Sequence, residues 1–211
     1  MIREEVRDKR FNFSFVMRRP EKWDKKMPLI ILLHGAGERG DGGESLYTVE
    51  KNGFAKIFTE DKNYECVLVS PQCGKNSFWA AKVPYIKEFI DQLKEAYDID
   101  EKRIYLTGVS MGGYGTWYTA MAYPDEFAAI APCCGGGMSW NAEVLKMPVW
   151  AFHGSCDDIV YLHNSTDMIE AMKKCGYSPK FTVFEGVGHN SWDYTFDEEL
   201  LFWLLSKSKQ C

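Results

Sequence analysis

Four short runs of continuous apolar residues constrain the fold of this chain more than any other feature of its sequence. Each run has the length of a strand and lacks the alternation of polar and apolar side chains that marks a half-exposed strand. This pattern is typical of a strand buried on both faces in a parallel sheet. The four runs are residues 29–33, 67–69, 104–106 and 149–152.

Stretches with helical spacing alternate with these runs. In residues 83–97, for example, four apolar side chains form one stripe, namely Ile86, Phe89, Ile90 and Leu93. Alternating strands and helices require right-handed crossovers. They predict an α/β fold with a doubly wound, mostly parallel sheet and helices on both faces. We expect a single domain over residues 1–211, whose other helices cover residues 111–123, 165–174 and 198–205.

The N-terminal region has a different period. Phe11, Phe13 and Phe15 alternate with Asn12 and Ser14, as expected of a strand with one face in solvent. We therefore predict an antiparallel strand at the start of the fold.

Composition excludes several classes of protein. Hydrophobic residues make up 45% of the 211 residues and charged residues 26%, which is close to the average for folded proteins. The net charge of −5, with both signs interspersed, argues against a nucleic-acid partner. No apolar run approaches the roughly 18 residues of a membrane span. Because the first residues also lack the apolar core of a secretory signal, we expect a cytoplasmic protein.

The seven cysteines do not have the paired spacing of a disulfide framework or a zinc site. Reduced thiols in a reducing compartment fit this pattern, and each thiol is interpreted as a small buried side chain. We expect no metal and no organic cofactor. The cysteines are at positions 66, 73, 133, 134, 156, 175 and 211.

A G-x-S-x-G pattern follows the strand at residues 104–106 directly and precedes a helical stretch. In this context Ser110 lies on a sharp, strained turn, and Gly108 and Gly112 let the strand and the helix approach each other. The Met111 N–H begins the helix, where it favours developing negative charge. Ser110 is the predicted nucleophile, and Met111 is predicted to donate to an oxyanion.

The first buried strand ends in a glycine-rich loop that begins at His34. An oxyanion hole needs a second backbone N–H, supplied by a loop that can bring main chain against a carbonyl oxygen. We predict that Ala36 supplies this N–H, with Gly37 as the alternative.

Two later loops supply an acid and a base. Asp157 and Asp158 follow the strand at residues 149–152, and Asp157 is favoured as the carboxylate that orients an imidazole. His189 lies in a loop of small residues after residues 181–184 and is the predicted base. The order Ser110, Asp157, His189 is the order found in α/β-hydrolases. The remaining histidines are interpreted as structural or exposed: His34, His153 and His163.

These loops carry a resemblance to a known family. The chain resembles a small α/β-hydrolase, close to bacterial carboxylesterases of the dienelactone-hydrolase and phospholipase/carboxylesterase type. The resemblance implies the α/β-hydrolase fold and a Ser-His-Asp triad. One departure is Tyr161, where many relatives have proline in the acid loop. The matching segments are residues 34–40, 108–115, 153–160 and 186–192.

Two features guide the prediction of substrate, namely the length of the segment that could form a lid and the positions of the tryptophans. Many relatives insert a helical lid after the strand near Cys133, but this chain has only the short segment 134–147, so we expect minimal or no lid. Trp79, Trp140 and Trp192 are predicted to contact substrate at the carboxyl edge of the sheet. The predicted function is hydrolysis of small or sugar-linked acyl esters, of acetyl or feruloyl type.

Two alternatives stay open at this stage. The first is a serine peptidase or amidase that resembles the catalytic domain of prolyl oligopeptidases, although the sequence contains no recognisable propeller. The second is a non-catalytic binding module on a hydrolase scaffold. A strained Ser110 retained together with an imidazole and a carboxylate argues against the second.

Overall fold

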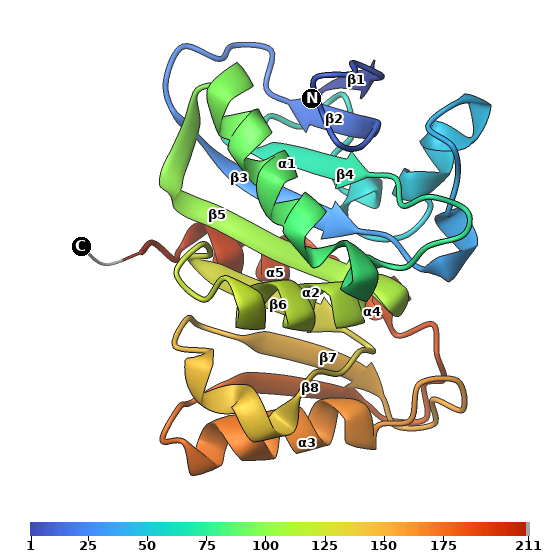
Figure 1. Cartoon of the computed structure of the whole chain (residues 1–211), viewed down its shortest axis with the longest axis vertical. Coiled ribbons are helices and arrows are strands. Elements are labelled where there is room, and N and C mark those ends of the chain that lie inside the picture. The colour runs from blue at the N-terminus through green and yellow to red at the C-terminus, as the bar shows by residue number, and fades with distance from the viewer. Residues whose placement is uncertain (210–211) are drawn as a thin grey trace.

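The computed structural model describes residues 1–209, and its centre is one eight-stranded sheet (Figure 1). The strand order is β1-β2-β4-β3-β5-β6-β7-β8. β1 pairs antiparallel with β2, and β2 pairs antiparallel with β4, whereas all later neighbours are parallel. This confirms the doubly wound, mostly parallel sheet. The strands are Ile2–Val6 (β1), Phe15–Arg19 (β2), Met27–Leu33 (β3), Val67–Pro71 (β4), Ile99–Val109 (β5), Ala129–Cys133 (β6), Trp150–Gly154 (β7) and Lys180–Phe184 (β8).

Helices cover both faces of the sheet, as predicted. α1, α2 and α3 lie in front of it in Figure 1, and α5 lies behind it. The buried side chains divide accordingly into two large clusters, one packed against α1, α2 and α3 and the other against α5. The helices are Val83–Ala96 (α1), Met111–Ala122 (α2), His163–Lys174 (α3), Trp192–Thr195 (α4) and Glu198–Leu205 (α5). Among residues 1–209, no helix has the length and apolar character to cross a membrane.

Five short 3₁₀ helices occupy the connections. Three of them follow β3, in a long connection that sequence periodicity did not predict. The connection between β6 and β7 contains only one, so no lid domain is inserted there among the described residues. The 3₁₀ helices are Ala36–Glu38 (η1), Glu44–Glu50 (η2), Phe54–Lys56 (η3), Trp79–Lys82 (η4) and Ser139–Val144 (η5).

The predicted strand over Phe11, Phe13 and Phe15 is wrong in its position. Residues 11–14 are irregular, and the strand begins only at Phe15. All three rings are nevertheless buried, and each lies 5.2–6.2 Å from the ring of Phe89 on α1. The alternation therefore arises from rings that pack against a helix. The antiparallel pairing at the start of the fold is made by β1 and β2.

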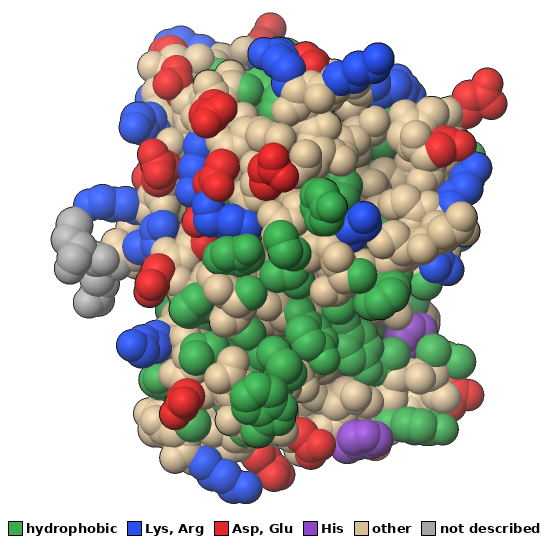
Figure 2. Space-filling view, viewed as in Figure 1, with side chains coloured by type: hydrophobic (Ala, Val, Ile, Leu, Met, Phe, Trp, Pro, Cys, Tyr) green, Lys and Arg blue, Asp and Glu red, His purple; other side chains and the backbone are tan. Residues whose placement is uncertain are grey.

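The parallel strands end at one edge of the sheet, on the right in Figure 1. Histidine side chains reach the surface at the same edge in Figure 2. Loops at the carboxyl ends of strands are where α/β proteins hold their chemistry.

Candidate active site

Ser110 lies between the end of β5 and the start of α2, in a strained backbone conformation. Its φ of 53° and ψ of −113° are unusual for a residue other than glycine. A side chain on Gly108 would collide with the backbone of Gly112, and one on Gly112 would collide with the carbonyl of Leu33. The two glycines therefore allow the tight strand-to-helix turn that presents the serine.

The structure brings Ser110, His189 and Asp157 into one chain of hydrogen bonds. Ser110 Oγ lies 2.9 Å from His189 Nε2, and His189 Nδ1 lies 2.8 Å from Asp157 Oδ2. Because Nδ1–H donates to the carboxylate, Nε2 is left to accept the serine proton. Asp158 is exposed, and Asp157 is the aspartate that contacts His189. The three side chains come from the loops that follow β5, β7 and β8.

Asp157 is buried and held on both oxygens. Its Oδ1 accepts the N–H groups of Ile159 and Val160, at 3.0 and 2.8 Å. Burial by itself would raise the pKa of Asp157, but the hydrogen bonds from His189, Val160 and Ile159 outweigh it, so this pKa lies below its ordinary value. The carboxylate is thus ionised and fixed in orientation.

His153 is a second histidine beside this carboxylate. Its Nε2 lies 3.3 Å from Asp157 Oδ2 and donates to the carbonyl of Val160 at 2.7 Å. Its Nδ1 lies 2.7 Å from Ser165 Oγ, on α3. Burial lowers the pKa of His153 despite the neighbouring carbonyl and carboxylate. His153 braces the acid loop, and this agrees with the structural interpretation made from sequence.

The two predicted oxyanion donors begin helices at the same edge of the sheet. Ala36 begins η1 and is exposed, and Met111 begins α2 and is half-buried. The first N–H groups of a helix have no partner within that helix. Gly37 is exposed, with open space where a side chain would be.

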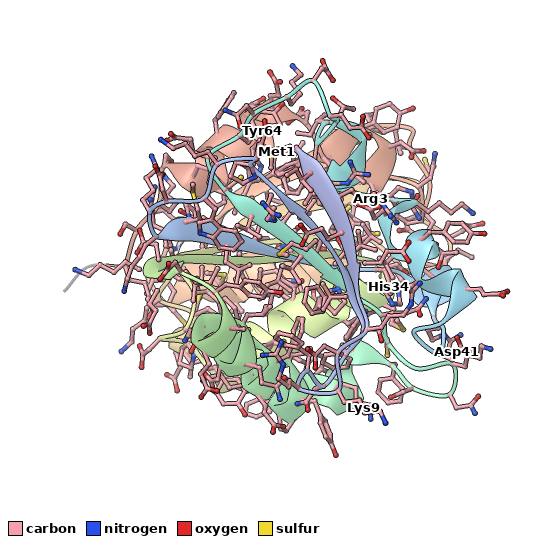
Figure 3. All side chains as sticks on the ribbon, turned by 90° about the horizontal axis from the view of Figure 1, so that it is seen from above. Met1, Arg3, Lys9, His34, Asp41 and Tyr64 are labelled. Carbon is pink, nitrogen blue, oxygen red and sulfur yellow. The ribbon has the colours of Figure 1, made fainter. Side chains whose placement is uncertain are left out.

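His34 anchors the start of this loop. Its Nε2 accepts the N–H of Cys73 at 2.9 Å, and its Nδ1–H donates to the carbonyl of Gly35 at 2.6 Å. Burial lowers the pKa of His34 to about 4, so the ring is neutral near pH 7. Figure 3 labels His34 and Asp41, which lie in the connection after β3 toward the edge where the strands end.

Gln72, directly after β4, ties the same loop together and was missed by sequence reasoning. Its Nε2 donates to the carbonyls of Glu38 and Ser45 at 3.0 and 3.1 Å, and its Oε1 accepts the N–H of Gly42 at 2.8 Å. The side chain is buried. The only sequence signal for a role of Gln72 is its position directly after a buried strand, because its hydrogen-bond partners are distant in sequence.

The three tryptophans that were predicted to contact substrate have different environments. The prediction that Trp79 contacts substrate is wrong, because its side chain is fully buried and its Nε1–H donates to the carbonyl of His34 at 2.9 Å. Trp192 packs edge-on against the ring of His189, with centroids 5.1 Å apart. Trp140 is exposed on η5.

The cysteines are more varied than the sequence suggested. Cys66, Cys73, Cys133 and Cys134 are buried, whereas Cys156 and Cys175 are exposed, and Cys211 lies outside the described residues. Burial raises the pKa of Cys134 well above its ordinary value.

The fold and the strained serine turn define the class of this protein: it is an α/β-hydrolase. Residues 63–200 match the family model described as phospholipase/carboxylesterase, and the chain belongs to that family.

Individual relatives agree with this assignment. The chain is 29% identical over 147 residues to a bifunctional acetylxylan esterase/xylanase of Neocallimastix patriciarum, an alignment that covers 67% of this chain and 21% of that protein. It is 29% identical over 138 residues to poly(3-hydroxyalkanoate) depolymerase C of Paucimonas lemoignei, covering 59% of this chain and 32% of that protein. The chain thus spans a fifth to a third of the length of these relatives.

A solved structure, described as a thermostable esterase, is similar over nearly the whole chain. The TM-score is 0.81 at 30% sequence identity, and the match covers 99% of this chain and 63% of that one.

Proposed function

We propose that this protein hydrolyses carboxylic esters through an acyl-enzyme on Ser110. One observation carries the proposal: a continuous hydrogen-bond chain from Ser110 Oγ through His189 to the buried carboxylate of Asp157. Such a chain can activate a hydroxyl that is otherwise a weak nucleophile.

The proposed reaction has two halves. His189 Nε2 takes the proton of Ser110 as Oγ attacks the ester carbonyl, and the resulting imidazolium is stabilised by Asp157. His189 then gives this proton to the leaving alcohol, which leaves the acyl group on Ser110. In the second half, His189 takes a proton from water and the hydroxide attacks the acyl carbonyl. His189 then returns this proton to Ser110 Oγ as the carboxylic acid departs.

In the proposed mechanism, backbone N–H groups stabilise the negative charge that develops on the substrate oxygen. The N–H groups of Ala36 and Met111 bind the oxyanion of each tetrahedral intermediate, with Gly37 as the alternative donor to Ala36. Such preorganised donors act without reorganisation when charge develops on the substrate oxygen.

The proposed substrates are small acyl esters, including acetyl or feruloyl groups linked to sugars. Three observations support this class: the short β6–β7 connection, the ring of Trp192 beside His189, and the exposed Trp140. The similarity to a bifunctional acetylxylan esterase/xylanase also supports an acetyl ester linked to a sugar.

The test is hydrolysis of p-nitrophenyl acetate and butyrate by the wild type and by Ser110→Ala. Activity should fall by about a thousandfold or more in the variant, whose fold is checked by circular dichroism. Two folded proteins with equally slow rates would contradict the proposal and favour a binding module.

The substrate class needs its own comparison. Rates on acetylated xylo-oligosaccharides and on feruloylated sugars should exceed those on simple ethyl esters of the same acids. Faster cleavage of matched amides than of esters would instead support the peptidase alternative.

We also propose a cytoplasmic location, on the ground that the six described cysteines are free thiols. Fractionation of the producing cells checks this, and recovery of the protein outside the cytoplasm would contradict it.

A further inference from the structure

A buried thiol lies against the candidate triad, and the proposed hydrolysis has no use for it. Cys134 Sγ, a carboxylate oxygen of Asp157 and a ring nitrogen of His189 all lie within 4.8 Å of one another. Cys134 has no exposed surface, the Asp157 side chain has none, and the His189 side chain is 19% exposed. The residue that follows β6 thus adds a side chain to a cluster otherwise built by the loops after β7 and β8.

The backbone fixes this thiol in place. Cys134 follows the last residue of β6 with a φ of 41°, a conformation that few residues other than glycine adopt. Its N–H donates to the carbonyl of Phe152 on β7 at 2.8 Å. The preceding carbonyl, of Cys133, accepts the N–H of Ser110 at 3.0 Å. Cys134 is therefore held between the nucleophile turn and the strand that precedes Asp157.

A thiolate, an imidazole and a carboxylate form a ligand set that suits a thiophilic divalent cation. Zinc bound by three protein side chains with one open position is a common arrangement, with ligand bonds of about 2.0–2.3 Å. Such bonds set tetrahedral ligand atoms about 3–4 Å apart. The Asp157–His189 pair, now 2.8 Å apart, would open slightly, and Cys134 Sγ already lies within 4.8 Å of both. Asp157 Oδ1 is already occupied by the N–H groups of Ile159 and Val160, which leaves Oδ2 for a cation.

We propose that Cys134, Asp157 and His189 form an inhibitory site for a thiophilic divalent cation such as Zn²⁺. On binding, the Cys134 thiol releases its proton to solvent, the Nδ1 proton of His189 moves by way of solvent to Nε2, and the cation takes the place of the Asp157–His189 hydrogen bond. His189 can then no longer serve Ser110 as a base. A chelator that removes the cation restores the hydrogen-bond chain and the activity. The inhibition rests on the proposed function, whereas the binding does not.

The first experiment titrates Zn²⁺ into the esterase assay for the wild type, Cys134→Ser, Cys133→Ser and Cys156→Ser, each scaled to its own zinc-free rate. Cys133 is the buried neighbour whose sulfur faces Ser191 and Thr195, and Cys156 is an exposed thiol. The inhibition constant should rise by about tenfold or more in Cys134→Ser alone, because one of three ligands is lost. Equal inhibition of all four proteins would overturn the proposal.

The second experiment reads binding without activity. Co²⁺ added to the Ser110→Ala protein should give a thiolate-to-cobalt charge-transfer band, which disappears in Ser110→Ala combined with Cys134→Ser. If wild-type hydrolysis is absent but the band is present, the proposed function fails and the cation site stands. If hydrolysis is present and the band is absent or independent of Cys134, the cation site fails. Cys134→Ala replaces the serine variant if that variant does not fold.

Discussion

The candidate site has two sides that are built in different ways. On the triad side, side chains meet directly through hydrogen bonds of 2.8–2.9 Å. On the proposed oxyanion side, the candidate N–H of Ala36 lies in a loop held in place by Gln72 and His34. Each side starts from a strand that runs into a His-Gly pair, His34-Gly35 after β3 and His153-Gly154 at the end of β7.

The hydrogen bonds of His34 and His153 illustrate how the two sides differ. His34 accepts a backbone N–H from Cys73 and so must be neutral, whereas His153 donates to a carbonyl next to an ionised carboxylate. The proposed oxyanion side therefore depends on a buried His34 that is neutral, and the triad side depends on an Asp157 carboxylate that is ionised. This contrast predicts that the two sides respond differently to substitution and to pH.

The largest expected effect is on the triad side, in Asp157→Asn. The amide cannot stabilise the imidazolium or hold the needed tautomer, so kcat should fall by about 10⁴. Asp158→Asn is the matched control, and its kcat should change by less than about twofold because Asp158 is exposed. A larger loss in the control than in Asp157→Asn would reverse the assignment of the acid.

The next largest effect is on the free energy of unfolding and comes from His34, on the proposed oxyanion side. The pKa of His34 is lowered to about 4 in the folded state, so the unfolded chain binds the proton first as pH falls. The stabilisation from neutral His34 is present above the unfolded pKa of about 6.5 and is lost as pH falls toward 4. The free energy of unfolding should therefore fall by about 2 kcal/mol between pH 7 and pH 5.

Urea unfolding at both pH values measures this loss. The loss of unfolding free energy between the two pH values should be smaller in His34→Gln. It should be unchanged in His163→Gln, which replaces an exposed histidine on α3. An equal pH dependence in the wild type and His34→Gln would contradict the account of His34.

The smallest effect is expected from Gln72→Ala, which removes the ties to Glu38, Ser45 and Gly42. Looser placement of the Ala36 N–H should lower kcat by about tenfold with little change in KM, because the oxyanion forms only in the transition state. Gln92→Ala, on α1 and far in sequence from this loop, is the control. A change in KM alone would show that Gln72 serves substrate binding instead.

The two sides also differ in how far sequence could predict them. The triad side follows local patterns: a glycine-flanked serine, and an acid and a base directly after buried strands. The oxyanion side depends on contacts between distant segments, such as Gln72 with the carbonyl of Glu38. Periodicity carries no information about such contacts.

The errors have the same physical origin. Phe11 and Phe13 alternate like strand residues because their rings pack on α1, and Trp79 is buried against the rings of Phe13 and His34. The nearness of Cys134 to Asp157 and His189 arises from neighbouring strands β6, β7 and β8. Strand order cannot be deduced from a local pattern.

In the proposed mechanism, Ser110 becomes covalently modified during the reaction. The most direct measurement is reaction with a serine-directed fluorophosphonate, followed by mass spectrometry of the peptides. We predict one adduct per chain, located on Ser110, absent in Ser110→Ala and strongly slowed in Asp157→Asn. An adduct on another residue, or ester hydrolysis that persists without any adduct, would contradict the account.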